Sequence, residues 1–116
     1  MPSGEEAILA QLVYTLVQTV PQGRVTTYGS IAKLLNTSPR VIGRILASND
    51  NPIVVPCHRV VRSDGGLGGY SFGGETFKAK LLMLEGVRVY RVGDRFYVGR
   101  EHIIDLNRIL SPKPLL

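Results

Sequence analysis

Residues 27–49 read TYGSIAKLLNTSPRVIGRILASN, and this stretch predicts two short helices separated by a tight turn. Thr27 can cap the first helix with its hydroxyl group, and Asn36 tolerates the left-handed conformation that often ends a helix. Ser38 followed by Pro39 is a start signal for the second helix, because a hydroxyl cap precedes a proline at the first helical position. Two short helices joined by so few residues are typical of a helix-turn-helix.

Basic residues are concentrated in the same part of the chain. The net charge is +5 overall, and residues 24–62 carry six basic residues and one acid, whereas residues 1–23 carry two acids and no base. Arg40 and Arg44 lie four residues apart on the second helix, so their side chains share a face. A basic face of this kind fits a polyanion such as DNA, and a solvated face without a ligand fits the charge equally well.

Short helices, short strands and turns alternate along the rest of the chain, which predicts one α+β domain over residues 1–116. Ser3 and Glu6 form a capping-box pattern at the start of a first helix, which the Pro21–Gly23 turn ends. The other expected elements are a β-prone segment at 24–26, a buried strand at 53–55, a strand at 60–61, a glycine-rich loop at 63–74, a helix at 75–84 stopped by Gly86, a hairpin at 87–98 and a tail from Ser111.

The composition excludes several classes of protein. With 44% hydrophobic residues, a chain of 116 residues can bury one packed core. Cys57 is the only cysteine, so no intramolecular disulfide forms, and with His58 and His102 as the other soft ligands a cysteine-based zinc site is excluded. No apolar run approaches the roughly 18 residues of a membrane span, and the start lacks a signal-peptide pattern. We therefore expect a soluble intracellular protein that holds no metal and contacts no membrane.

The pentapeptide PCHRV at residues 56–60 offers the most reactive side chains. A cysteine beside a histidine can be a nucleophile with its base, although a lone cysteine is more often a small buried hydrophobe. If these residues continue the preceding strand, the side chains of Cys57 and His58 point to opposite faces, and a water molecule can bridge them. Glu85 can orient His58 and so complete a Glu85–His58–water–Cys57 relay, whereas an ordinary surface acid is the alternative for Glu85 alone.

Together with GYS at residues 69–71 and LEG at residues 84–86, the pentapeptide resembles the O6-alkylguanine-DNA alkyltransferase family. The resemblance covers about residues 5–90, nearly all of the family's C-terminal active-site domain, and leaves residues 91–116 as a C-terminal extension. It implies a small winged-helix-like fold with a helix-turn-helix, short strands and a C-terminal hairpin. It also implies DNA repair by direct reversal, in which the protein moves an alkyl group from O6-alkylguanine in double-stranded DNA to its own cysteine. The reaction happens once and needs no cofactor. The resemblance further implies a monomer located in the cytoplasm or, in a eukaryote, in the nucleus.

The resemblance implies a role for individual positions. Cys57 matches the alkyl acceptor, and His58 and Glu85 match the relay that forms its thiolate. Asn49 matches a hinge asparagine that braces the active-site turn, and Arg40 matches the arginine finger that fills the space left by the extruded base. Three groups are expected to contact the guanine. Tyr28 turns the nucleotide out and donates to the base, and the backbone groups of Cys57 and Val60 accept from the guanine amine. Tyr70 and Ser71 lie in the loop that covers the base.

Three departures from the family pattern accompany the resemblance. The family commonly has a further domain ahead of this one. Arg44, which we expect to contact DNA phosphate, stands where small residues are usual, and Phe72 is a one-residue insertion after Ser71. A non-enzymatic lesion-binding protein is the alternative, because alkyltransferase-like proteins are also single domains, but they have tryptophan or alanine where this chain has Cys57. A helix-turn-helix transcription regulator explains the basic helix but neither the pentapeptide nor Glu85.

Overall fold

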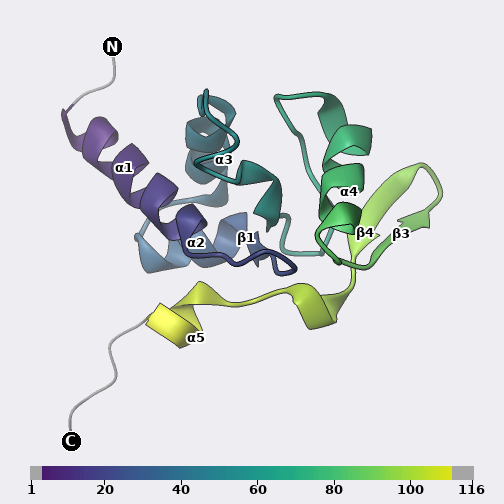
Figure 1. The fold of residues 1–116 in the computed structure, drawn as a ribbon. Coiled ribbons are helices and arrows are strands. Elements are labelled where there is room, and N and C mark those ends of the chain that lie inside the picture. Colours follow the sequence, from purple (N-terminus) through teal and green to yellow (C-terminus); the bar gives the residue numbers. More distant parts are fainter. Residues whose placement is uncertain (1–3, 111–116) are drawn as a thin grey trace, which may run out of the picture.

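The computed structural model describes residues 4–110 and has the predicted α+β architecture (Figure 1). In chain order its elements are α1 (Gly4–Gln18), β1 (Thr26–Thr27), α2 (Tyr28–Leu34), α3 (Pro39–Ala47), the 3₁₀ helix η1 (Cys57–Arg59), β2 (Val60–Val61), α4 (Gly74–Leu84), β3 (Val89–Val92), β4 (Arg95–Val98), the 3₁₀ helix η2 (Arg100–His102) and α5 (Leu106–Leu110). Among these helices, none is long and apolar enough to cross a bilayer.

Helices α2 and α3 form the predicted helix-turn-helix. The Thr27 hydroxyl accepts from the Ser30 backbone N–H at 2.9 Å and so caps α2. The Ser38 hydroxyl caps α3 in the same way, and Pro39 occupies the first turn of that helix. Between the two helices Asn36 has a φ of 57°, which is the left-handed conformation expected there.

The helix-turn-helix shares a hydrophobic core with α1. Val13 of α1, Ile31 of α2 and Ile42 of α3 are fully buried in this first core, and each such side chain stabilises the fold by about 1.5–3 kcal/mol. The Tyr14 hydroxyl adds a hydrogen bond to a backbone carbonyl of α3 at 3.1 Å. These contacts fix the orientation of α3 relative to α1. Ser3, the predicted capping residue of the first helix, lies outside the described residues.

A second core joins the short strands, α4 and the C-terminal hairpin. β1 pairs in parallel with β2, with Thr26 opposite Val60. β3 and β4 form the predicted antiparallel hairpin, and Gly93 turns it with a φ of 63°. Leu82 of α4 is fully buried in this core, and Gly86, with a φ of 89°, follows the end of the helix as predicted.

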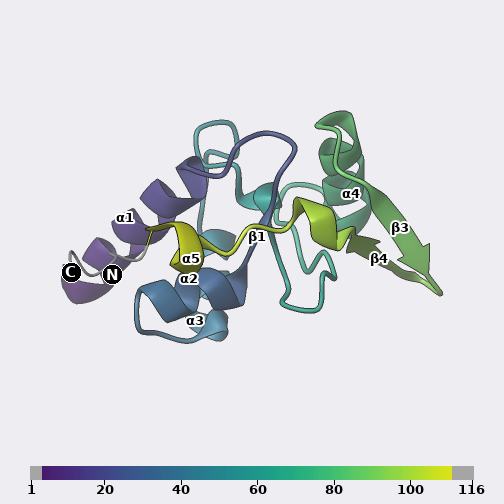
Figure 2. The ribbon, with the colours of Figure 1, turned by 90° about the horizontal axis from the view of Figure 1, so that it is seen from below.

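The chain after the hairpin runs back across the molecule toward α2, and we call residues 99–110 the C-terminal strap (Figures 1 and 2). Its backbone lies beside that of Val25, just ahead of β1. The Val25 N–H donates to the His102 carbonyl at 2.9 Å, and the Ile104 N–H donates to the Val25 carbonyl at 2.7 Å. The strap therefore pairs with the chain at Val25 on the side opposite to β2.

The strap also contacts the first helix of the helix-turn-helix. The Ser30 hydroxyl of α2 accepts from the Leu106 N–H, and the Asn107 side-chain amide donates to the Ser30 carbonyl, both at 2.8 Å. The Leu106 side chain is buried in the first core. Residues 91–110 thus complete both cores rather than form a separate appendage, whereas the tail from Ser111 lies outside the described residues.

The prediction of a buried strand at residues 53–55 is wrong. The segment forms a turn, in which Ile53 is 91% exposed. The Asn51 side-chain oxygen accepts from the Val54 N–H at 3.2 Å, and the Asn51 carbonyl accepts from the Val55 N–H at 3.0 Å. Asparagine bonds of this kind satisfy the local backbone without a neighbouring strand, so the apolar run curls instead of extending.

Candidate active site

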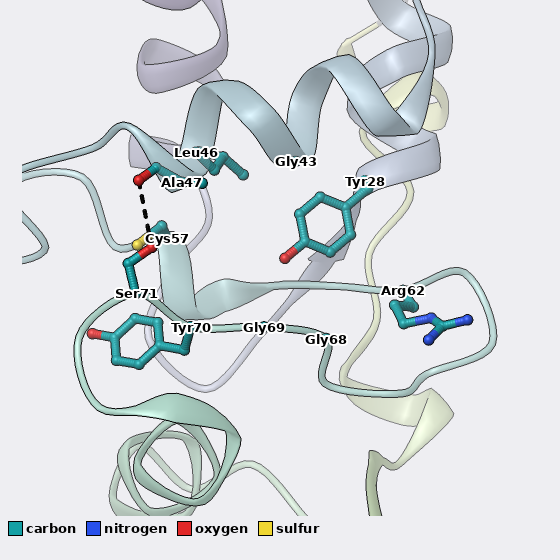
Figure 3. A pocket seen from close by; sticks show the side chains of 10 residues that line it. All are labelled: Tyr28, Gly43, Leu46, Ala47, Cys57, Arg62, Gly68, Gly69, Tyr70 and Ser71. Carbon is teal, nitrogen blue, oxygen red and sulfur yellow. Dashed lines mark hydrogen bonds between the residues drawn. The ribbon is translucent and has the colours of Figure 1, made fainter.

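A pocket of about 540 Å³ lies between α3 and the glycine-rich loop that precedes α4 (Figure 3). Small-molecule sites in proteins commonly have volumes of about 300–1,000 Å³. Tyr28 points its hydroxyl group into the pocket from the start of α2, and Cys57 lies across from it beside Ser71. The pocket thus brings together four residues that the sequence singled out, namely Tyr28, Cys57, Tyr70 and Ser71.

Cys57 is the first residue of η1, is 7% exposed and is a free thiol. The prediction that Cys57 and His58 continue a strand is wrong, because the Arg59 N–H donates to the Pro56 carbonyl at 2.9 Å and closes a helical turn. Successive side chains on a 3₁₀ helix are about 120° apart. Cys57 and His58 therefore still point in different directions, for a reason other than strand alternation.

His58, the residue after Cys57, forms a largely buried pair with Glu85. His58 Nε2 lies 3.0 Å from Glu85 Oε1, and both side chains are less than 15% exposed. Burial lowers the pKa of His58 below its ordinary value, although the charge and hydrogen bond of Glu85 oppose this effect. Burial alone would raise the pKa of Glu85, but its hydrogen bonds and ion pairs with Arg59 and His58 lower it overall. A neutral histidine beside an ionised glutamate can act as a base.

The two pocket tyrosines keep their protons. Burial raises the pKa of Tyr28 and of Tyr70, and a negative charge on Cys57 raises both further. Gly68 borders the Tyr28 ring with a φ of 72°, so a side chain there would be both strained and close to the ring. The Ser71 hydroxyl donates to the Ala47 carbonyl at 3.4 Å across one end of the pocket. The Tyr28 hydroxyl can donate to a molecule bound in the pocket, the Ser71 hydroxyl can do so only by releasing the Ala47 carbonyl, and the Tyr70 hydroxyl points away from Tyr28.

Asn49 connects the end of α3 to the segment that leads into η1. Its side chain is buried, and the amide N–H donates to the Val55 carbonyl at 3.0 Å. Its side-chain oxygen accepts from the Asn51 N–H at 3.1 Å. Asn49 therefore braces the turn from both of its polar atoms.

Two arginines stand on the exposed side of α3. Arg40 occupies the first turn and is exposed. Arg44 is also exposed, and its guanidinium contacts the Glu6 carboxylate of α1 at 2.8 Å. An exposed ion pair of this kind contributes only about 0–1 kcal/mol, so Glu6 holds the Arg44 side chain only weakly.

The sequence profile of the 6-O-methylguanine DNA methyltransferase, DNA binding domain, matches residues 9–87. The chain belongs to this family. The matched segment holds the helix-turn-helix, η1 and Glu85, and it ends before the hairpin and the C-terminal strap begin. The resemblance inferred from the pentapeptide is confirmed.

Relatives of the chain include both methyltransferases and a DNA-bound protein. A methylated-DNA--protein-cysteine methyltransferase of Pyrobaculum aerophilum is 51% identical over 96 residues, which cover 82% of this chain and 61% of that protein. The structure of S. pombe Atl1 in complex with damaged DNA containing O6-carboxymethylguanine matches with a TM-score of 0.76 at 27% identity, over 90% of this chain and 98% of Atl1. The O6-methylguanine-DNA methyltransferase from Pyrococcus kodakaraensis matches with a TM-score of 0.59 at 46% identity, over 73% of this chain and 47% of that chain. The chain thus spans only part of the length of these two methyltransferases.

Sequence reasoning missed Lys78, which this member of the methyltransferase family buries completely. Its ammonium group donates to the carbonyls of Val60 at 2.8 Å, Leu67, and Gly69 at 3.3 Å. It also lies 5.8 Å from the centre of the Tyr28 ring. Lys78 therefore ties β2 to the glycine-rich loop behind the pocket.

The buried environment of Lys78 lowers the pKa of its ammonium group. Burial lowers the pKa of Lys78 from 10.5 to about 8, against the opposing effect of a negative charge on Cys57. The one signal in the sequence that could have revealed this lysine is its spacing, four residues before the buried Leu82 on α4. Arg59 was also missed.

Two further details bear on the predicted contacts with guanine. Val60 is fully buried, and because its carbonyl already accepts from Lys78, one lone pair is left for another donor. Phe72, the inserted loop residue, packs edge-on against Tyr70 with ring centroids 5.7 Å apart. Within residues 4–110 there is no group of three or more histidine, cysteine, aspartate or glutamate side chains that could hold a metal ion.

Proposed function

We propose that this protein repairs DNA by direct reversal, moving one alkyl group from O6-alkylguanine in duplex DNA to Cys57. The observation that carries the proposal is the position of Cys57, in a pocket bordered by the second helix of a helix-turn-helix and next to the buried His58–Glu85 pair. The chemistry needs a DNA-docking helix, a base-sized pocket and an activated cysteine. The methyltransferase name of its relatives supports the same reaction.

The transfer of the alkyl group needs no cofactor. His58 takes the proton of Cys57, with a water molecule between them, and the thiolate attacks the alkyl carbon. The bond between that carbon and guanine O6 breaks, and its electron pair stays on the guanine. The Ser71 hydroxyl can stabilise the departing oxygen with a hydrogen bond, and the base takes up a proton through Tyr28, which regains one from water. A thioether has no good leaving group, so each protein molecule reacts once.

The alkylated base has to leave the duplex before it can enter the pocket. Flipping a nucleotide costs a few kcal/mol, and a side chain inserted into the base stack offsets part of that cost. Arg40 suits this task because it is exposed at the start of α3. Arg44, one turn further along, suits a phosphate contact.

The partner we infer is double-stranded DNA that contains O6-alkylguanine. The basic stretch at residues 24–62 supplies the charge for this contact. We further infer that the protein acts as a monomer, in the cytoplasm or, in a eukaryote, in the nucleus.

A lesion-binding protein that transfers nothing is the second candidate. The observation that favours it is the match to Atl1, which covers 98% of that DNA-bound protein. Cys57 argues against it, because alkyltransferase-like proteins have tryptophan or alanine at this position. The two candidates predict the same binding and different chemistry.

Mass spectrometry of the intact protein after incubation with duplex DNA carrying O6-methylguanine separates the two candidates. Direct reversal predicts that the protein gains one methyl group, located on Cys57 by peptide mapping. The control is Cys57→Ala, which should still bind the lesion and gain no mass, because binding depends on phosphate contacts and the pocket. Lesion binding by the parent without any mass gain would support the binding protein, and demethylation by Cys57→Ala would refute the role of Cys57.

A further inference from the structure

Arg59 holds Glu85 with a two-pronged contact. Arg59 Nε donates to Glu85 Oε1 at 3.0 Å, and Arg59 Nη2 donates to Glu85 Oε2 at 2.6 Å. The third nitrogen, Nη1, donates to the Val20 carbonyl at 3.0 Å. The two side chains are 16% and 14% exposed, so water screens their interaction little. Such a fork fixes both the position and the plane of the carboxylate.

Glu85 Oε1 serves two neighbours, because His58 Nε2 also lies 3.0 Å from it. A guanidinium only donates hydrogen bonds and stays charged, so it keeps Glu85 ionised. An ionised carboxylate only accepts, so neutral His58 carries its proton on Nε2 and its lone pair on Nδ1. Nδ1 is buried and has no hydrogen-bond partner among residues 4–110.

We propose that Arg59 is a positioning residue, which fixes the charge and orientation of Glu85 and thereby leaves Nδ1 of His58 as the basic nitrogen that serves Cys57. The inference rests on the proposed function for the role of Cys57 as the nucleophile. Arg59 acts through Glu85 and takes no part in bond making.

The charge of Arg59 also acts on the pKa of His58. Burial lowers the pKa of His58, Glu85 raises it, and the positive charges of Arg59 and Lys78 lower it. The ring of Tyr70 is a further titratable neighbour, edge-on to His58 at 6.4 Å between centroids. Without the charge of Arg59, the pKa of His58 rises. His58 then stays protonated up to a higher pH, and a protonated His58 cannot take a proton from Cys57.

The test measures how fast iodoacetamide alkylates Cys57 in the whole chain between about pH 5 and 9. At about pH 6, Arg59→Met should react about three- to tenfold more slowly than the parent, and at about pH 9 the two rates should converge. Arg59→Lys keeps the positive charge and should recover most of the rate at the lower pH. Arg88→Met is the matched control, because Arg88 grips Glu101 at the surface with two contacts of 2.8 Å, and its profile should follow that of the parent.

Two readouts distinguish positioning from a merely structural role. A structural role would lower the Tm of Arg59→Met without moving the acid limb of the profile, and an unmoved limb in the folded variant overturns the proposal. Nitrogen chemical shifts of His58 should show its proton on Nε2 in the parent, and a proton on Nδ1 overturns the proposal even if Arg59→Met does not fold. Iodoacetamide needs no DNA, so a shifted acid limb without methyl transfer would refute the proposed function and leave the inference about Arg59 intact.

Discussion

Replacing Lys78 with methionine should remove one source of pH dependence from the stability of the fold. Burial lowers the pKa of Lys78 to about 8 in the folded protein, from its ordinary 10.5. Between these two pH values the unfolded chain holds a proton that the folded protein has released, so raising the pH through this window stabilises the folded state. The whole difference corresponds to about 3 kcal/mol, of which about 2 kcal/mol falls between about pH 7.5 and 9.5.

Urea unfolding of the parent and of Lys78→Met over this pH range is the assay. The free energy of unfolding of the parent should rise by about 2 kcal/mol relative to that of Lys78→Met, which moves the urea midpoint by about 1–2 M. Lys80→Met is the matched control, because Lys80 is exposed on the same helix, and its values should change in parallel with those of the parent. Parallel pH profiles for the parent and Lys78→Met would refute the reasoning that folding buries a charged lysine.

Four further predictions concern the relay, Arg40 and Arg44 on α3, and the C-terminal strap. His58→Ala and Glu85→Gln should each slow methylation of Cys57 by about 10²–10⁴-fold, and the double variant should be little slower than the worse single one; fully additive effects would show that the two act separately. Arg40→Ala should slow transfer from duplex DNA much more than from free O6-benzylguanine, which needs no flipping, and equal slowing on both would remove Arg40 from that step. Arg44→Ala should weaken binding to damaged and undamaged DNA alike and lower the salt slope by about one, as titrations at several salt concentrations would show. Leu106→Ala should lower the free energy of unfolding in urea by about 2–4 kcal/mol, because it leaves a cavity in the first core; a loss below about 1 kcal/mol would contradict the burial of the strap.

Elements with a local cause were predictable from the sequence. The hydroxyl caps at Thr27 and Ser38 and the left-handed residues Asn36 and Gly86 act on backbone groups only a few positions away. The prediction of a strand at residues 53–55 failed because a strand does not depend on local residues alone. The apolar composition of this segment favours a strand, but a strand also needs a neighbouring backbone to pair with, and composition alone does not reveal one.

The site was predictable where a motif marks it. The pentapeptide indicated Cys57 and His58, and the structure places Glu85, 27 residues further along, against His58. Arg59 and Lys78 carry no such mark, because a charged residue in a short segment or on a helix is usually a surface residue. Their importance depends on burial and on distant carbonyl or carboxylate partners, which only the folded chain reveals.

The C-terminal strap has a consequence for the order in which the domain can form during synthesis. Leu106 bonds to Ser30 across 76 positions of the chain. Ribosomes add about 5–20 residues per second, so α2 emerges roughly 4–15 s before the segment that supports it exists. Until that segment is made, the first core lacks the buried Leu106 side chain, and the backbone of Val25 has no strap to pair with. A nascent chain paused between the hairpin and the strap would therefore present an incompletely supported helix-turn-helix, open to chaperones and proteases, and would complete it only once the strap has been made.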